Sequence, residues 1–175
     1  RVKENALVEN CSFGGWHYGN AGWNKCIVFD DAHNSDINNC TFRSYVGPIG
    51  GGTGQGVYWA SEAAIHIHGD AKATDIYIHQ VKFYGFKYGI KMNGTMEGVQ
   101  IAQGVWVHSK IGISWDGHAY DGTNSQAGDP EGARAGPFNW PLLVVTDCHL
   151  NCNEYNIEVR AGWQTIIKGC SFYGV

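Results

Sequence analysis

The fold is encoded most compactly in residues 64–92, which read AIHIHGDAKATDIYIHQVKFYGFKYGIKM. Ile65 and Ile67 alternate with polar residues, which predicts a short strand with one buried face. A Gly-Asp turn and two more apolar pairs follow, and Ile90-x-Met92 then repeats the first piece. Each predicted strand is too short to be stable alone, so we expect the unit to bury its apolar side against copies of itself.

Copies of this unit recur along the whole chain. The closing part is an apolar residue, a small residue three positions later and an aromatic residue two positions after that. Full or partial matches are Val8-Cys11-Phe13, Ile37-Cys40-Phe42, Ile78-Val81-Phe83, Ile101-Gly104-Trp106, Val145-Cys148-Leu150 and Ile167-Cys170-Phe172. The opening part, apolar-x-apolar, occurs as Ile27-Phe29, Ile65-Ile67, Ile90-Met92, Ile113-Trp115 and Ile157-Val159.

The spacing of the matches predicts a coil of short parallel strands with one turn per repeat. The shortest repeats, Val81 to Gly104 and Cys148 to Cys170, are 23 and 22 residues long. Successive turns would stack at roughly 4.8 Å, so equivalent side chains would form columns. Asn10, Asn39, Gln80, Gln103 and Asp147 would then form a structural ladder at one corner.

This pattern resembles right-handed parallel β-helix proteins of the pectate-lyase and phage-tailspike kind, over essentially the whole chain. The resemblance implies an all-β fold, a right-handed single-stranded parallel β-helix (a solenoid) of six turns with loop insertions. The length of 175 residues fits one domain over residues 1–175, which we expect to be an excised fragment of a larger chain. The polygalacturonase motifs Asn-Thr-Asp, Ser/Gly-His-Gly and Arg-Ile-Lys are absent, and no pectate-lyase calcium-site spacing is evident.

Composition narrows the possible partners. The formal net charge is -4 and no basic cluster occurs, which argues against nucleic acid. No apolar run is long enough to cross a membrane as a helix. Seven Trp and nine Tyr favour sugar or protein contacts. Four of the six Cys fall in an inward column, which predicts free thiols; no metal site or cofactor is expected, because no Cys or His pair has zinc spacing.

Three insertions interrupt the repeats, at residues 14–25, 43–63 and 116–141. They border one face, the outward side of the opening strands, here called the opening face. Insertions in a solenoid often lie on its binding side, so the opening face is the predicted site. Its outward positions form two columns, Val28, His66, Lys91, Ser114, Glu158 and Asp30, His68, Asn93, Asp116, Arg160.

Asp116 and Glu158 are the leading candidates for a catalytic carboxylate pair. They are expected one turn and two positions apart, about 8 Å, which falls in the window of about 6.5–9.5 Å for inverting glycosidases. Arg160 would lie beside Asp116, so a surface ion pair is the alternative interpretation. Asp30, beside His68, is the reserve candidate. The third insertion offers further carboxylates, Asp121, Asp129 and Glu131.

Further residues are candidates for substrate binding. His66 and His68 share a face and would bind sugar hydroxyls, transfer protons or hold a metal; an ordinary exposed pair is the alternative. Lys91 and Arg160 would hold a substrate carboxylate, or form solvated surface charge. The remaining candidates are Asn93 and the aromatic residues Tyr120, Trp140 and Trp59, which would stack on a pyranose ring or fix their own loops.

The leading functional hypothesis is a tailspike-type depolymerase domain that binds and degrades a bacterial surface polysaccharide, by hydrolysis rather than lyase elimination. The resemblance implies a homotrimer on a virion tail, synthesised in the host cytoplasm and acting outside the cell. A lyase would use His66 or Tyr120 as base with Lys91 or Arg160 as cation. Two further hypotheses are a non-catalytic glycan receptor-binding or structural shaft module and a secreted pectin-type lyase or hydrolase.

Overall fold

The computed structural model describes residues 2–14, 24–48, 57–116, 142–160 and 164–173. These residues form strands joined by short turns, and no helix occurs among them. The strands are β1 (Val2–Glu4), β2 (Leu7–Glu9), β3 (Ser12–Gly14), β4 (Lys25–Asn38), β5 (Thr41–Arg43), β6 (Val46–Pro48), β7 (Val57–Trp59), β8 (Ser61–His79), β9 (Lys82–Tyr84), β10 (Phe86–Ala102), β11 (Val105–Asp116), β13 (Leu142–Thr146), β14 (His149–Val159), β15 (Gln164–Lys168) and β16 (Ser171–Tyr173). The prediction of an all-β fold is confirmed for this part of the chain.

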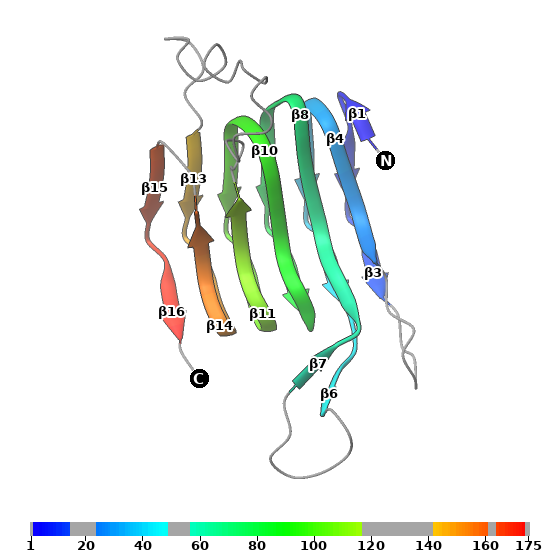
Figure 1. Ribbon diagram of the computed structural model, residues 1–175, viewed down its shortest axis with the longest axis vertical. Helices are drawn as coiled ribbons and strands as arrows, with labels where there is room; N and C mark the ends of the chain where they lie inside the picture. The colour runs from blue at the N-terminus through cyan, green and yellow to red at the C-terminus, as the bar shows by residue number, and fades with distance from the viewer. Residues whose placement is uncertain (1, 15–23, 49–56, 117–141, 161–163, 174–175) are drawn as a thin grey trace.

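Strands one repeat apart lie side by side and pair in parallel (Figure 1). The front layer contains the opening strands: β1, the first halves of β4, β8 and β10, and the later parts of β11 and β14. β8 and β10 turn over the top of Figure 1 and enter the back layer. There the closing strands pair, namely β2, the second halves of β4, β8 and β10, β13 and β15.

A third set of parallel pairs completes each repeat, formed by β3, β5, β9, the start of β11, the start of β14 and β16. The pairing of all three sets is parallel and the sheets are nearly closed, an arrangement compatible with a parallel β-solenoid.

The predicted inward columns are confirmed by the strand register. Ile37 pairs with Val8 on one side and Ile78 on the other, and the column continues to Ile167. In the aromatic column, ring centroids are 4.8 Å apart for Phe13 and Phe42, 5.2 Å for Phe42 and Phe83, and 4.9 Å for Phe83 and Trp106. These spacings match the distance between neighbouring strands, so each ring lies over the next.

Gly104 shows why the column of small residues matters. A Cβ on Gly104 would lie 2.5 Å from the Trp106 ring. The repeat that carries the largest aromatic residue therefore has no side chain at the neighbouring inward position. The small residue at position 104 thus offsets the large one at position 106, as a closely packed core requires.

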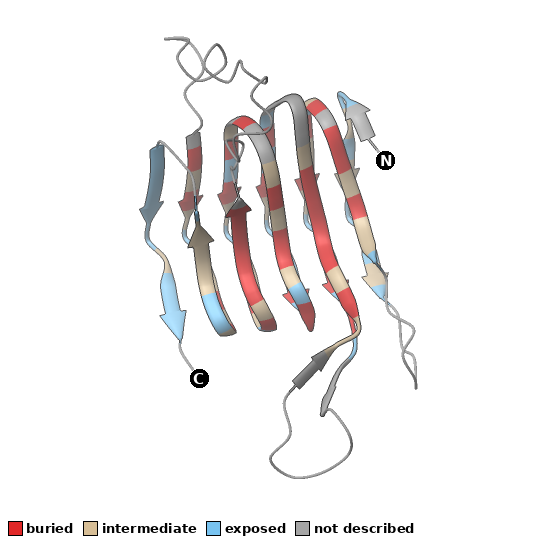
Figure 2. Ribbon diagram, in the orientation of Figure 1, coloured by how far each residue is buried: buried red, intermediate tan, exposed pale blue. Residues whose placement is uncertain are grey.

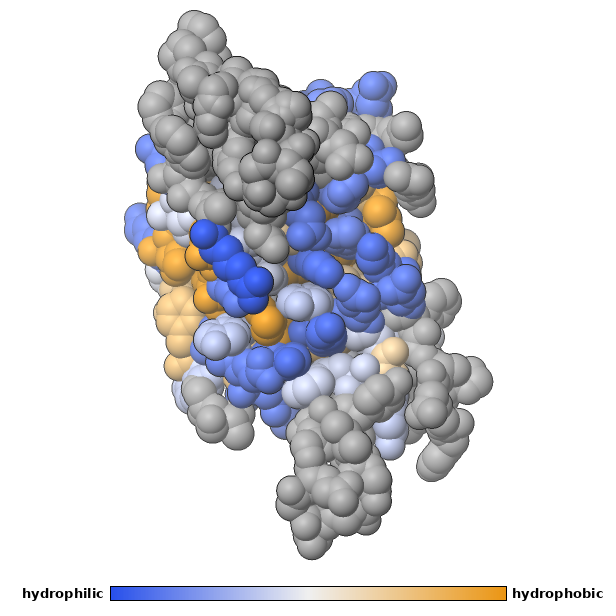
Figure 3. Space-filling model, viewed as in Figure 1, coloured by the Kyte–Doolittle hydropathy of each residue, from blue (hydrophilic) through white to orange (hydrophobic). Residues whose placement is uncertain are grey.

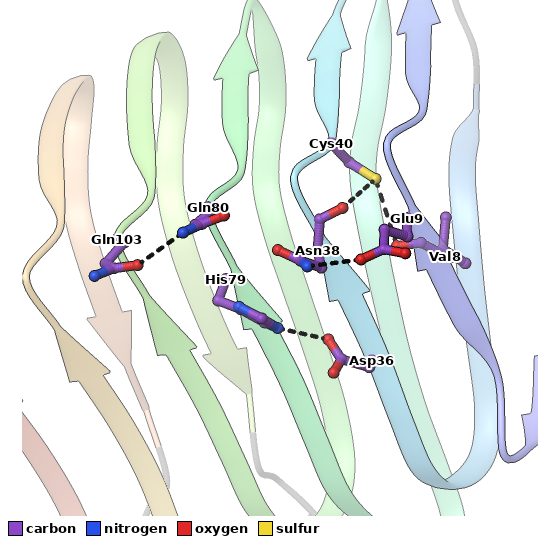
Figure 4. A network of polar contacts seen from close by, with 8 residues as sticks. All are labelled: Val8, Glu9, Asp36, Asn38, Cys40, His79, Gln80 and Gln103. Atoms are coloured by element: carbon purple, nitrogen blue, oxygen red, sulfur yellow. Dashed lines mark hydrogen bonds and ion pairs between the residues drawn. The ribbon is translucent and has the colours of Figure 1, made fainter.

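The predicted corner ladder is also confirmed. Asn10, Asn39, Gln80, Gln103 and Asp147 all have left-handed backbone, with φ between 49° and 56°. Their backbone N–H groups donate to carbonyls of the next repeat at 2.9–3.2 Å. The side-chain amide of Asn39 donates to that of Asn10 at 2.7 Å. The bond between the side chains of Gln80 and Gln103, at 3.4 Å, is shown in Figure 4. Asn and Asp are among the residues that tolerate this conformation best.

Two local features differ from what the sequence indicated. The chain bends at the predicted Gly-Asp turn after Ile67, but β8 continues through the bend: Gly69 pairs with Gly94, and pairing resumes after a register shift at Ala73 and Met96. The second insertion contains an antiparallel hairpin, β6 with β7, which its Gly-rich sequence did not reveal.

The prediction of free thiols is confirmed: all six cysteines are unpaired. Burial raises the pKa of Cys26 and Cys148 to about 11 and that of Cys152 to about 12. Cys152 belongs to the hydrophobic core, a role that its position outside the predicted column left open. Such thiols stay protonated near neutral pH and act as small apolar groups.

Candidate functional site

The opening face has the two outward columns that the repeats predict. His66 pairs in register with Val28 and Lys91, and Ser114 pairs with Lys91 and Glu158. In the second column, His68 pairs with Asp30 and Asn93, and Asn93 pairs with Asp116. Figure 3 shows hydrophilic residues over much of this side of the molecule.

Several polar side chains of the opening face are buried although they point away from the core of the coil. Asp30 is 6% exposed, His66 7% and Ser114 6%. Outward polar residues of the closing strands, such as Asp36 and His79, are half-buried or exposed. Figure 2 shows long buried runs on β8 and β11, whereas β15 and β16, in the last turn of the described part, are exposed along their whole length. Polar groups tolerate burial when other polar groups replace water, so the contacts among these side chains decide what the face can do.

His66 is enclosed although it faces outward. Its Nε2 lies 2.8 Å from Oδ1 of Asn93. An amide oxygen only accepts, so Nε2 carries the proton and Nδ1 has a free lone pair. Nδ1 is buried and has no hydrogen-bond partner among the described residues. Burial lowers the pKa of His66; the bond to Asn93 opposes this, and the charges of Lys25 and Lys91 reinforce it.

His68 and Asp30 form a second cross-strand contact. His68 Nδ1 lies 3.5 Å from Asp30 Oδ1, and the side chains are 35% and 8% exposed. The rings of His66 and His68 are 5.8 Å apart. The predicted adjacency of Asp30 and His68 is confirmed. A buried carboxylate beside a more exposed imidazole is an arrangement suited to proton transfer.

Lys91 has a partner that the sequence did not indicate. Its Nζ lies 2.7 Å from Oε1 of Glu62, and 5.0 Å from the centre of the Tyr88 ring. The hydrogen bond from Lys91 lowers the pKa of Glu62, against an opposing effect of burial. Glu62 precedes the opening pair by three positions, outside the motif from which candidates were chosen. Lys91 is therefore an anchored cation and not a freely solvated one.

Glu158 belongs to a second charged cluster on this face. Its Oε1 accepts from Arg160 Nε at 3.1 Å and Nη2 at 2.9 Å, and its Oε2 accepts from Ser114 Oγ at 3.2 Å. The Glu158 side chain is 16% exposed and that of Arg160 is 62% exposed. The sequence placed Arg160 beside Asp116, whereas the structure also engages it with Glu158 on the same strand. Residues two apart on a strand share a face, which explains the contact.

The remaining candidates are separated from this cluster or lie outside the described part. The backbone of Asp116 ends β11, one strand from Glu158 as predicted, but its side chain is outside the described atoms. Tyr120 and Trp140 also lie outside the described residues. Trp59 ends β7, and its indole Nε1 donates to the backbone carbonyl of His108 at 2.9 Å. That contact places Trp59 at the start of the opening strands, away from His66.

Neither a metal-ligand cluster nor a membrane-spanning helix occurs in the described part of the chain. Among those residues, no three His, Cys, Asp or Glu side chains are placed to hold a metal ion together. The same residues include no helix long and apolar enough to span a bilayer.

No protein-family model, curated protein or solved structure matches this chain.

Proposed function

We propose that the chain is a right-handed single-stranded parallel β-helix domain of the tailspike-depolymerase type. The parallel register of all three strand sets supports the coil. Crossovers between parallel strands of one sheet are right-handed in about 98% of cases, which supports the hand. The attachment points of the insertions support a binding role for the opening face, because β3, β7 and β11 end beside its two edges.

In this proposal the opening face binds and cleaves a bacterial surface polysaccharide. One observation carries it: outward polar side chains, Asp30, His66 and Ser114, are buried and form hydrogen bonds with residues on neighbouring strands. A solenoid needs no such groups on its exterior to fold. Clusters of enclosed titratable groups with specific partners occur preferentially at functional sites.

The reaction that suits this face best is hydrolysis by Asp116 and Glu158. Both oxygens of Glu158 already accept hydrogen bonds from Arg160 and Ser114, an arrangement that suits the base that activates water. Asp116 then takes the role of the acid that protonates the leaving oxygen. Positions 116 and 158 lie one strand and two residues apart, a separation of about 8 Å that leaves room for the attacking water of an inverting glycosidase.

A non-catalytic glycan-binding module is the second candidate. It is favoured by the pairing of carboxylates on the described part of the face: Glu62 bonds to Lys91, Glu158 to Arg160, and Asp30 to His68. Paired side chains make a polar surface that binds sugar hydroxyls without cutting the chain. For either function, the proposed partner is a bacterial polysaccharide, the assembly a homotrimer, and the place of action a virion tail outside the cell.

The test uses Asp116→Asn and Glu158→Gln, with Asp36→Asn on the closing strands as the matched control. Each protein is incubated with bacterial capsular and O-antigen polysaccharides, and new reducing ends and chain length are measured. The two opening-face variants should lose about 10²- to 10⁴-fold in rate, the usual contribution of a general acid or base, while Asp36→Asn keeps full activity.

Full activity in both opening-face variants contradicts the assignment of Asp116 and Glu158. Retention of a polysaccharide by the unaltered chain without any shortening, over a long incubation, establishes the binding module instead. Thermal unfolding of each variant shows whether a loss of activity reflects a loss of folding.

A further inference from the structure

A cluster of aromatic residues lies at the start of the opening strands, apart from the His66 site. Trp59 ends β7, at the lower end of the front layer in Figure 1. Its indole N–H donates to the carbonyl of His108 at 2.9 Å, and the His108 ring lies edge-on to Tyr84, with centroids 5.6 Å apart and an interplanar angle of 85°. Tyr84 is 43% exposed. The three residues, together with Lys110, are called the Trp59 corner below.

His108 lies at a corner where the backbone is left-handed. Its φ is 55°, in the left-handed region, and Gly85 at the equivalent corner one repeat earlier has φ 81°. The register is clear, because the Gly85 N–H donates to the carbonyl of Val107, the residue before His108. Glycine adopts this conformation without strain, whereas most side chains make it costly. Histidine is one of the side chains that tolerate this conformation, and glycine accepts it freely, so His108→Gly removes the ring while keeping the backbone conformation.

Lys110 adds charge beside the rings. Its Nζ lies 6.0 Å from the centre of the Trp59 ring and 3.1 Å from Glu154 Oε1. The corner thus combines exposed ring surface with a phenol, an imidazole, an ammonium group and a carboxylate. Apolar faces edged by hydrogen-bonding groups match a pyranose, which has C–H groups on its faces and hydroxyls around its rim. A purely apolar protein partner would leave these polar groups without water or partners.

We infer that the Trp59 corner is a second sugar subsite, which stacks a pyranose ring of the same glycan chain that the proposed function places on the opening face. This inference rests on that proposed function. Lys110 and Ser114 are four residues apart on β11, roughly 13 Å along the strand. An oligosaccharide spans that distance and a monosaccharide does not. The subsite therefore selects for long chains and contributes binding away from the reacting bond.

The experiment compares Tyr84→Ala, Trp59→Phe and His108→Gly with Tyr77→Ala, an exposed tyrosine on the closing strands. Trp59→Phe keeps a ring but removes the indole N–H. Retention is measured by affinity electrophoresis in gels that contain bacterial capsular or O-antigen polysaccharide, with thermal unfolding in parallel. Tyr84→Ala and His108→Gly should weaken binding roughly 3- to 10-fold, the range for one aromatic contact. For His108→Gly, this weaker binding should be accompanied by a Tm equal to or higher than that of the unaltered chain.

Binding of Tyr84→Ala and His108→Gly that equals binding of the unaltered chain overturns the subsite and leaves the proposed function intact. A fall in Tm for His108→Gly with unchanged binding shows a structural role for the ring and also overturns it. If the unaltered chain is retained by none of the polysaccharides, the proposed function fails, and the subsite fails with it.

Discussion

The opening and closing strands carry the same kind of residue pair in two different settings. On the opening face, His68 and Asp30 are 3.5 Å apart, and the Asp30 side chain is 8% exposed. On the closing strands, His79 and Asp36 are 2.8 Å apart, and the Asp36 side chain is 40% exposed (Figure 4). The closer contact is the more exposed one. Distance alone thus does not distinguish a surface ion pair from a candidate site; enclosure by neighbouring polar groups does.

The other outward residues of the opening and closing strands also differ in their surroundings. Polar contacts cross between strands on the opening face, as from His66 to Asn93. The closing strands expose apolar side chains outward, including Leu7 at 64%, Tyr77 at 40% and Ile166 at 48%. Both sets nevertheless bury equivalent isoleucine columns inward. The backbone and the core are shared, so the difference between the two surfaces resides in the outward residues.

The largest expected effect tests whether the inward sides are equivalent. Ile67→Ala on the opening strand and Ile78→Ala on the closing strand each remove a fully buried side chain from β8. Each should lower the free energy of unfolding by about 2–5 kcal/mol, measured by urea denaturation. A large loss in one variant and almost none in the other would show that the two sheets do not share one core.

An intermediate effect separates the two Asp–His pairs. Asp30→Ala removes an enclosed acceptor and should cost about 1–3 kcal/mol of stability, because the donors around the buried Asp30 carboxylate lose their acceptor. Asp36→Ala removes an exposed partner and should cost no more than about 1 kcal/mol. Urea denaturation of both variants at pH 7 measures the difference. Equal costs would remove the distinction between the faces.

A smaller effect concerns pH. Burial lowers the pKa of His66, so the unfolded chain takes up a proton at higher pH than the folded chain. Stability should therefore fall as pH drops from about 6.5 through the folded pKa of His66, and return above that range. The lowered pKa of Glu62 acts below its ordinary value of 4.5, so measurements from pH 8 to pH 5 isolate His66 from Glu62.

The matched variants for this pH effect are His66→Gln and His79→Gln. The unaltered chain should lose more stability than His66→Gln between pH 8 and pH 5, as measured by urea denaturation at each pH. His79→Gln keeps His66, so it should show the same His66-dependent loss of stability as the unaltered chain. An identical pH profile for His66→Gln and the unaltered chain would contradict the enclosed environment of His66.

The inward structure could be predicted from the sequence because stacking imposes one residue class on each column. Phe83 and Trp106 had to be neighbours once the period was known, and Asn39 and Gln80 had to share a corner. Outward contacts carry no such constraint. Nothing in the sequence indicates that Asp30 is enclosed and Asp36 is not, since both are aspartates on outward positions of β4.

Two other features escaped prediction for related reasons. The bond between Lys91 and Glu62 joins an outward column position to a residue outside the repeat motif, and long side chains reach several positions from their own column. The contact of Arg160 with Glu158 runs along one strand, whereas the column pattern pairs Arg160 only with residues of neighbouring strands. Side-chain reach, and not strand register, decides both contacts.

The most direct measurement of the central claim is histidine-selective NMR of the chain during titration with oligosaccharides from a capsular or O-antigen polysaccharide that the chain retains. His66 and His68 mark the opening face, His79 marks the closing strands and His149 the third set. The account predicts that the imidazole resonances of His66 and His68 shift with glycan concentration while those of His79 and His149 stay in place. Shifts at His79 or His149, with none at His66 and His68, would contradict it.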